Sequence, residues 1–220
     1  MKTPQKISVF DLDHTLINGN CSSLFFLYLI KRKILPRRVL CYYPLYKLKF
    51  HIFGWSLQKL HERVFRKLLK GRSFIDVKQA LCDFLLIKLP DIWNHSVIAY
   101  LKRAQHLGHY TVILSNSPSF LVEPIAKLLN VDECQATEYI VDELGFFQRI
   151  SKILDGPQKA YFIKKIATKF SLGRGDLTAY SDSYHDIAML EAVDHPVAVN
   201  PDSKLLHFSQ KKQWKVLFHA

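Results

Sequence analysis

The chain has 220 residues, 49% of them hydrophobic and 13% aromatic, which excludes a disordered chain and allows one core with or without a smaller inserted domain. The formal net charge is +12, and this excess lies in residues 31–72, which hold thirteen of the 31 Lys and Arg residues and one acid, Glu62. The four cysteines are scattered, with no CxxC pair and no Cys/His cluster at zinc spacing, which argues against a disulfide framework or zinc site and favours a reducing compartment.

The N-terminal segment MKTPQKISVFDLDH predicts a first strand at ISVF. Two acids, Asp11 and Asp13, follow this run directly. They stand where a secretion signal would need its apolar region, so we expect no such signal and a cytoplasmic location.

Residues 18–90 carry no clear strand-and-turn signal and have a helical, aromatic-rich pattern. We therefore expect a helical cap at 18–90, inserted after the first strand of a core formed by 1–17 and 91–220. Its predicted helical pieces are SSLFFLYLIKRKI, RRVLCYYPLYKLKFHIFGW, SLQKLHERVFRKLLKG and SFIDVKQALCDFLLIKL.

Strand-like and helix-like segments alternate in the rest of the chain. The apolar runs YTVIL, LTAY and PVAV predict buried strands, and ATEYIVDELGFFQRI predicts a β-hairpin that turns at 143–145. This alternation predicts an α/β fold with a Rossmann-like parallel sheet covered on both faces. The predicted helices are 95–109, ending near Gly108, and 119–130, 158–170 and 186–193.

The segment FDLDHTL places Asp11, Asp13 and Thr15 just after the first strand. Alternate residues of an extended segment point the same way, so both carboxylates can face one site while Leu12 packs inward. Two adjacent carboxylates favour a cation between them, and Mg²⁺ prefers such hard oxygen ligands. One carboxylate can then attack phosphorus while the other exchanges protons with the leaving group and water. The alternative is a pair of strand-end acids that only cap a helix.

Three further groups carry chemistry. Ser115 and Asn116 in SNS follow a strand and can cradle phosphate, although such residues before a proline often form only a turn. Lys159, near the start of a predicted helix, can balance carboxylate and phosphate charge or remain an ordinary surface lysine. In YSDSYHD, Asp182 can ligate a metal, while Asp186 either caps a helix or supports the metal from its outer shell.

In order, FDLDHTL, SNS, GPQK and YSDSYHD resemble the four motifs of the haloacid dehalogenase-like superfamily, especially the subfamily IB branch that holds phosphoserine phosphatase. The resemblance covers about residues 5–17 and 91–202 and implies a helical cap between the first two motifs. It implies a Mg²⁺-dependent phosphomonoester hydrolase that forms an aspartyl phosphate. The implied roles are Asp11 as nucleophile and metal ligand, Asp13 as general acid/base and ligand through its backbone carbonyl, Ser115 and Lys159 on phosphate, and Asp182 on Mg²⁺ with Asp186 in support.

One departure from that branch concerns the substrate. Phosphoserine phosphatases carry a glutamate nine residues after the nucleophile, and Asn20 stands at that position here. A buried ammonium without a carboxylate partner is costly, which argues against phosphoserine, although Asn20 can still accept one hydrogen bond from a substrate.

The basic cap segment also contains many aromatic residues, a combination typical of peripheral membrane segments. This favours a peripheral position at the inner face of an anionic membrane. Some relatives in the branch that the motifs resemble act on phosphatidylglycerophosphate, so the resemblance implies a small-molecule phosphate or a lipid head-group phosphate of that type as substrate. The alternative is that the aromatic residues form the cap's own core. They are Phe25, Phe26, Tyr28, Tyr42, Tyr43, Tyr46, Phe50, Phe53 and Trp55.

Two other functions remain open from the sequence. The aspartyl phosphate could pass its phosphoryl group to an acceptor other than water. A non-catalytic protein could instead use the basic cap to bind anionic lipid or nucleic acid, but no recognised nucleic-acid motif occurs, so nucleic acid is not expected as a partner.

Overall fold

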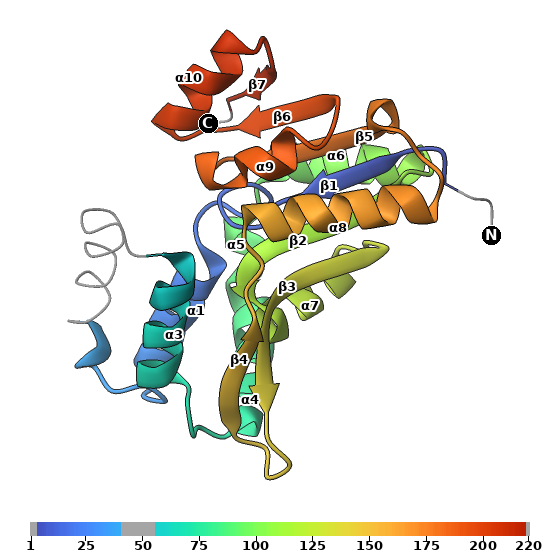
Figure 1. The fold of residues 1–220 in the computed structure, drawn as a ribbon. Coiled ribbons are helices and arrows are strands. Elements are labelled where there is room, and N and C mark those ends of the chain that lie inside the picture. Colours follow the sequence, from blue (N-terminus) through green and yellow to red (C-terminus); the bar gives the residue numbers. More distant parts are fainter. Residues whose placement is uncertain (1–3, 41–55, 219–220) are drawn as a thin grey trace.

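The structure, a computed structural model, describes residues 4–40 and 56–218 (Figure 1). Its centre is a seven-stranded sheet with the strand order β4-β3-β2-β1-β5-β6-β7. Neighbouring strands are parallel except for β3 and β4, which are antiparallel. The strands are β1 (Ile7–Phe10), β2 (Tyr110–Pro118), β3 (Glu133–Val141), β4 (Phe147–Lys152), β5 (Leu177–Ser181), β6 (His195–Val199) and β7 (Lys215–Leu217).

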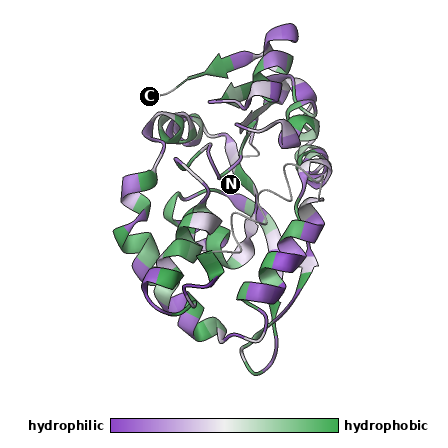
Figure 2. Ribbon diagram, turned by 90° about the vertical axis from the view of Figure 1, so that its left-hand side faces the viewer, coloured by the Kyte–Doolittle hydropathy of each residue, from purple (hydrophilic) through white to green (hydrophobic). Residues whose placement is uncertain are grey.

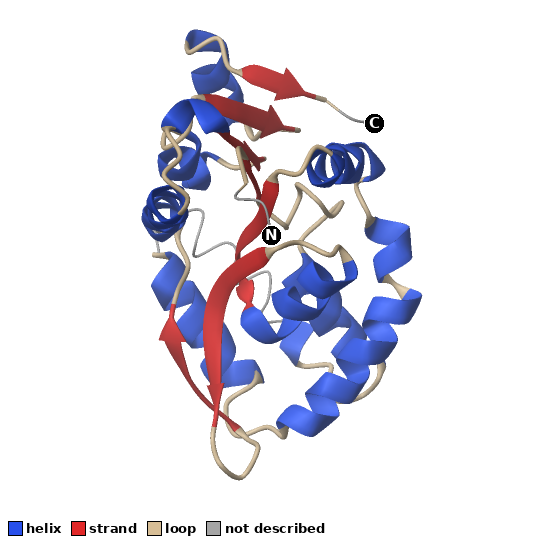
Figure 3. Ribbon diagram, turned by 90° about the vertical axis from the view of Figure 1, so that its right-hand side faces the viewer, coloured by secondary structure: helices blue, strands red, loops and turns tan. Residues whose placement is uncertain are grey.

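Helices lie on both sides of this sheet (Figure 3). Alternation along the strands explains the two layers, because Ile7 and Val9 belong to one core cluster whereas Phe10 belongs to the other. The predicted α/β fold is confirmed. The core helices are α6 (His95–His106) and α7 (Ser119–Leu128) on the Phe10 side, and α8 (Gly156–Lys169), α9 (Ile187–Leu190) and α10 (Ser203–Lys211) on the other.

Three of the four helical pieces predicted within 18–90 are helices, whereas most of the piece RRVLCYYPLYKLKFHIFGW lies outside the described residues. The described part forms α1 (Cys21–Lys31), α3 (Leu57–Leu68) and α4 (Phe74–Ile87), followed by the short α5 (Leu89–Ile92). Side chains of Asn20, Ser56 and Ser73 accept hydrogen bonds from backbone N–H groups in the first turns of α1, α3 and α4, respectively, which explains where these helices begin. Figure 2 shows hydrophobic and hydrophilic residues alternating along these helices, as expected when one face is buried.

Aromatic side chains join the cap helices to the core. Phe25 on α1 packs against Phe84 on α4, with ring centroids 5.3 Å apart, and against Phe120 on α7 at 6.3 Å. Of the nine aromatic residues singled out above, Phe25 is therefore part of a core, while those from Tyr42 to Trp55 lie outside the described residues. Within 4–40 and 56–218, no helix is both long and apolar enough to cross a membrane.

The predicted hairpin is present, and it reaches beyond the rest of the sheet toward the cap (Figure 1). Gly145 takes a positive φ of 83° at its turn. Hydrogen bonds from Gly71 N to Phe147 O and from Phe74 N to Gly145 O, both 2.8 Å, tie the hairpin to the segment between α3 and α4. The hairpin thus braces the cap although it belongs to the core segment in sequence.

Some predicted boundaries differ from the structure. The helix expected over 186–193 is the four-residue α9, preceded by a 3-10 turn, η2 (Tyr184–Asp186). A second 3-10 turn, η1 (Arg174–Asp176), precedes β5. The helix expected over 95–109 ends at His106, with Gly108 at a φ of 74° just beyond it.

Candidate active site

The strand register brings the sequence motifs to one edge of the sheet. Phe10 pairs with Ile113 on β2 and with Tyr180 on β5, so β1 and β5 end at nearly the same level, while β2 continues past them to Pro118. Asp11 follows Phe10, and its backbone N–H donates to Tyr180 O at 2.9 Å. The C-terminal edge of a parallel sheet is where open α/β folds bind their ligands.

A buried lysine joins two acids at this edge. Lys159 Nζ lies 2.6 Å from Asp11 Oδ1 and 2.8 Å from Asp186 Oδ2, and all three side chains are buried. Burial alone would lower the pKa of Lys159, but the two carboxylates outweigh it and raise that pKa. Lys159 is therefore not an ordinary surface lysine, and it remains charged at the centre of the site.

The carboxylates crowd one another. Burial raises the pKa of Asp11 well above its usual range, Lys159 opposes this rise, and the charges of Asp186, Asp182 and Asp13 add to it. Burial and the neighbouring Asp186 likewise raise the pKa of Asp182 to about 7. Burial is the larger cause of both shifts and the neighbouring carboxylates add to it, so a cation in the site would favour the charged forms.

Asp13 faces the cleft, but not because it alternates with Asp11 along an extended strand, as expected. β1 ends at Phe10, so the chain beyond it turns rather than continuing as a strand. The Asp13 carboxylate accepts hydrogen bonds from the backbone N–H of Cys21 and from Ser117 Oγ, both at 2.6 Å. Leu12 is fully buried as predicted, but a turn, not strand alternation, places the two acids.

The SNS segment forms the end of β2. Ser115 is fully buried, and its Oγ accepts a hydrogen bond from the backbone N–H of Ser117 at 3.1 Å. Asn116 and Ser117 line the cleft, whereas Ser115 lies behind them. The side-chain oxygen of Asn116 is buried and has no hydrogen-bond partner among the described residues.

Asp182 and Asp186 follow β5. Asp182 Oδ1 accepts a hydrogen bond from Thr15 Oγ1 at 3.3 Å. Asp186 accepts from Ser181 Oγ at 2.8 Å, and although it precedes α9, its side chain makes no capping hydrogen bond. The helix-cap alternative for Asp186 is therefore wrong. Its carboxylate instead accepts a hydrogen bond from Lys159 Nζ and pairs with its charge.

Asn20 caps the N-terminus of α1. Its Oδ1 accepts hydrogen bonds from Ser23 N at 2.9 Å and Ser23 Oγ at 2.8 Å, as the N-cap of α1. A carbonyl oxygen offers two lone pairs, and both are used here. The expectation that Asn20 can accept a hydrogen bond from a substrate ammonium is therefore wrong for this conformation, although the residue lines the cleft.

A cleft of about 370 Å³ opens over these residues. This volume lies within the range of small-molecule sites. Asp11, Asp13, Lys159, Asp182 and Asp186 line its polar end, and cap helices α1 and α3 form much of the remaining wall.

The donor set fits a hard divalent cation. Asp186 Oδ1 is buried without a hydrogen-bond partner among the described residues, and a cation in the site would favour the charged forms of Asp11 and Asp182, whose pKa values are raised. Across the described residues, no three His, Cys, Asp or Glu side chains form a complete metal cluster. A Mg²⁺ site here would use two carboxylates, a backbone carbonyl and non-protein oxygens, a pattern that Mg²⁺ accepts.

Sequence reasoning did not assign roles to Ser117 and Ser181, which contact Asp13 and Asp186, respectively. Both stand inside the recognised motifs, at strand ends. Hydroxyl residues are common in such turns, so only their hydrogen-bond partners distinguish them.

The chain is similar in sequence to curated proteins over most of its length. The chain is 29% identical over 221 residues to the "Inhibition of morphological differentiation protein" of Streptomyces azureus, covering 98% of this chain and 79% of that protein. It is 26% identical to "Phosphoserine phosphatase SerB1" of Mycobacterium tuberculosis, covering 94% of this chain and 68% of that protein.

Solved structures share the fold. A Bordetella pertussis protein described as of unknown function superposes with a TM-score of 0.85 at 22% identity, covering 98% of this chain and 99% of that one. A phosphoserine phosphatase solved as an analogue of its phospho-aspartyl intermediate gives a TM-score of 0.72 at 17% identity, covering 99% and 94%. The model of the haloacid dehalogenase-like hydrolase family matches residues 8–191, and the chain belongs to this family.

Proposed function

We propose that this chain is a Mg²⁺-dependent phosphomonoester hydrolase in which Asp11 is the nucleophile. The observation that carries the proposal is the buried contact of 2.6 Å between Asp11 and Lys159, in a cleft that Asp13 and Asp182 also line. Relatives named as phosphatases support the reaction class. The helix-cap alternative for the acids does not explain why a lysine is buried between two of them.

The first step joins Asp11 to phosphorus. A carboxylate oxygen of Asp11 forms a bond to the phosphorus atom, and the bond from phosphorus to the leaving oxygen breaks. Lys159 orients Asp11 and offsets negative charge on the phosphoryl oxygens. Asn116 lines the adjoining wall, and we assign phosphate contact to it. The phosphate role that the family motif implies for Ser115 would need this buried hydroxyl, which accepts from Ser117 N, to become exposed to the cleft.

Asp13 acts as the general acid and then as the general base. In its protonated form it gives a proton to the leaving oxygen, and as a carboxylate it then takes one from the water that attacks the aspartyl phosphate. That attack releases phosphate and restores Asp11. Hydrogen bonds from Cys21 N and Ser117 Oγ hold the Asp13 carboxylate in place for both roles.

The metal would lie among Asp11, the backbone carbonyl of Asp13 and Asp182, with Asp186 behind them. When bound, Mg²⁺ supplies Lewis-acid charge that neutralises phosphate oxygens. Thr15 holds Asp182 from the side, and Lys159 and Ser181 hold Asp186.

The test replaces Asp11 by Asn. An amide cannot form the acyl phosphate, so we expect Mg²⁺-dependent hydrolysis of p-nitrophenyl phosphate to fall to background in Asp11→Asn. Asp91→Asn, which alters an exposed aspartate outside the cleft, is the matched control and should retain the parent rate. Hydrolysis that persists in Asp11→Asn would refute the nucleophile assignment.

A further inference from the structure

The cleft has two chemically different ends. The catalytic end carries the acids and Lys159, whereas the wall formed by α1 and α3 is largely apolar. Leu27 in this wall is 49% exposed, which places apolar surface in contact with solvent. The apolar side chains that α1 and α3 contribute are Phe26, Leu27, Ile30, Leu60, Val64 and Leu68.

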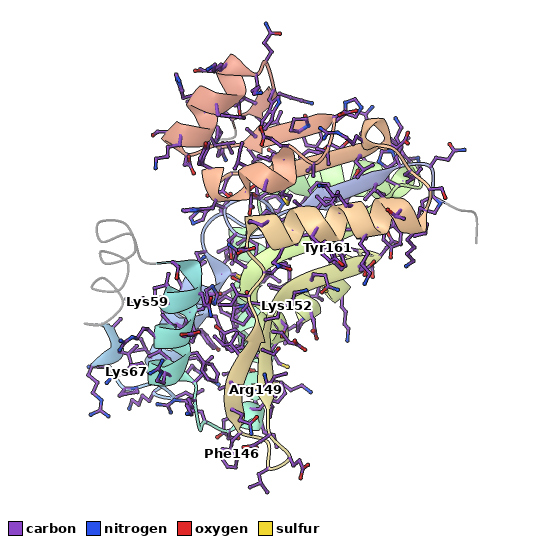
Figure 4. The ribbon with its side chains drawn as sticks, viewed as in Figure 1. Lys59, Lys67, Phe146, Arg149, Lys152 and Tyr161 are labelled. Atoms are coloured by element: carbon purple, nitrogen blue, oxygen red, sulfur yellow. The ribbon has the colours of Figure 1, made fainter. Side chains whose placement is uncertain are left out.

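The positive charge of the described part of the cap lies outside the cleft. None of the described Lys and Arg residues of 31–72 lines it. Figure 4 shows Lys59 and Lys67 on α3 beside Arg149 and Lys152 on β4, and all four are exposed. The basic surface therefore does not provide a subsite for a second anionic group among the described residues of the wall.

Among the described cap residues that line the cleft, the polar groups carry no charge that would bind an ion. His61 is the titratable side chain among the described cap residues that line the cleft, and burial lowers its pKa to about 4, so it is neutral at pH 7. Its Nδ1 lies 3.3 Å from Tyr139 Oη on β3. Asn20 has already used both lone pairs of its oxygen on Ser23.

On the basis of the proposed phosphatase function, we propose that the cap wall selects phosphomonoesters whose leaving group is an uncharged alkyl chain. The phosphate would lie at Lys159 and the chain along the side chains of α1 and α3, since these form one continuous cleft with the acids. Substrates with an ammonium near the phosphate would lose its hydration without gaining a carboxylate partner in this wall.

The test is a series of primary alkyl phosphates from ethyl to octyl, assayed with Mg²⁺ below their micelle concentrations. Each methylene that enters the apolar wall should raise kcat/KM about fourfold, until the chain outgrows the cleft. Phosphoserine and phosphoethanolamine should be hydrolysed with a lower kcat/KM than propyl phosphate.

Two variants address the wall directly. Leu27→Gln and Leu60→Gln keep a good helix former while placing an amide in the wall, and each should reduce the octyl-to-ethyl ratio of kcat/KM by about tenfold or more. Leu86→Gln, on an exposed leucine of α4 outside the cleft, is the matched control and should keep the parent ratio.

The outcomes separate the two proposals. Equal kcat/KM for ethyl and octyl phosphate, with hydrolysis still lost in Asp11→Asn, would overturn the alkyl selectivity and leave the phosphatase standing. Calorimetric binding of both esters to Asp11→Asn gives a readout without turnover: octyl phosphate should bind more tightly, and equal affinities would overturn the inference whether or not the parent protein is active.

Discussion

The position of the Asp13 carboxylate depends on two hydrogen bonds from other parts of the chain. Asp13 stands two residues after Asp11, yet its carboxylate is held by Ser117, 104 residues away in sequence, and by the N–H of Cys21 at the start of α1. Ser22 Oγ lies 2.7 Å from Ser117 Oγ and extends this network into the cap. The proposed acid/base is thus positioned jointly by the core and the first cap helix.

We therefore expect Ser117→Ala to impair proton transfer more than binding. The loss in kcat/KM, which reports the step that releases the leaving group, should be about tenfold to a hundredfold for an alkyl phosphate, because its leaving oxygen needs a proton. The loss should be smaller for p-nitrophenyl phosphate, whose leaving group is a weaker base. Steady-state kinetics with both esters measure this difference, and Ser117→Thr, which keeps the hydroxyl, should recover much of the rate. Equal losses with both esters would contradict a positioning role.

At the scale of elements, the start of α8 sets the place of Lys159. Gly156, the first residue of α8, lies so close to η2 that an added Cβ would be 2.3 Å from the carbonyl oxygen of His185. This approach brings the first turn of α8 against the segment that carries Asp186. A side chain at 156 would have to push these two elements apart, since the obstacle is backbone.

Gly156→Ala should therefore cost about 1–3 kcal/mol of unfolding free energy and lower kcat as well, because Lys159 would shift from Asp11. Urea unfolding and phosphatase assays would measure the two effects. Gly175→Ala is the matched control: a Cβ there meets Asp194 only at 3.9 Å, and a change within about 0.5 kcal/mol is expected. Equal stability of the two variants would show that α8 and η2 can separate freely.

Across the whole molecule, charge is divided between a basic exterior and an acidic catalytic end. The pKa of Asp182, raised to about 7, has a consequence for stability. A carboxyl whose pKa is higher in the folded state stabilises the fold below its unfolded pKa of 3.8, and this contribution is lost as pH rises through about 7. The metal-free protein should accordingly lose stability as pH rises from about 4 to about 7.

Mg²⁺ should restore that stability where Asp182 is ionised. At a hundredfold excess over its Kd, the gain should approach about 2.7 kcal/mol at pH 8, or roughly 5–10 °C in Tm, and it should be smaller at pH 5.5, where protons compete for the site. Thermal unfolding with Mg²⁺ or with EDTA at both pH values measures this. Asp182→Asn should abolish most of the gain at pH 8, whereas an equal gain at both pH values would contradict the assignment.

Apolar patterning along the chain predicts the fold class and the edge of the sheet where the site lies. The apolar runs before Asp11, Ser115 and Asp182 identify buried parallel strands, and the carboxyl ends of such strands share one edge of the sheet. The helical nature of the described cap segments also followed from their pattern. The boundaries near α9 were less predictable, because the short turn η2 there is shaped by its contact with α8.

The role of each side chain at that edge depends on contacts that form when the elements pack together. The tertiary structure buried Lys159 between two acids, one of them 148 residues away in sequence, turned Asp13 toward Ser117, and engaged Asn20 as a helix cap. It also brought the apolar faces of α1 and α3 to the cleft. The physical reason is that periodicity reports which face of an element is apolar, whereas contacts between distant residues depend on how the elements pack.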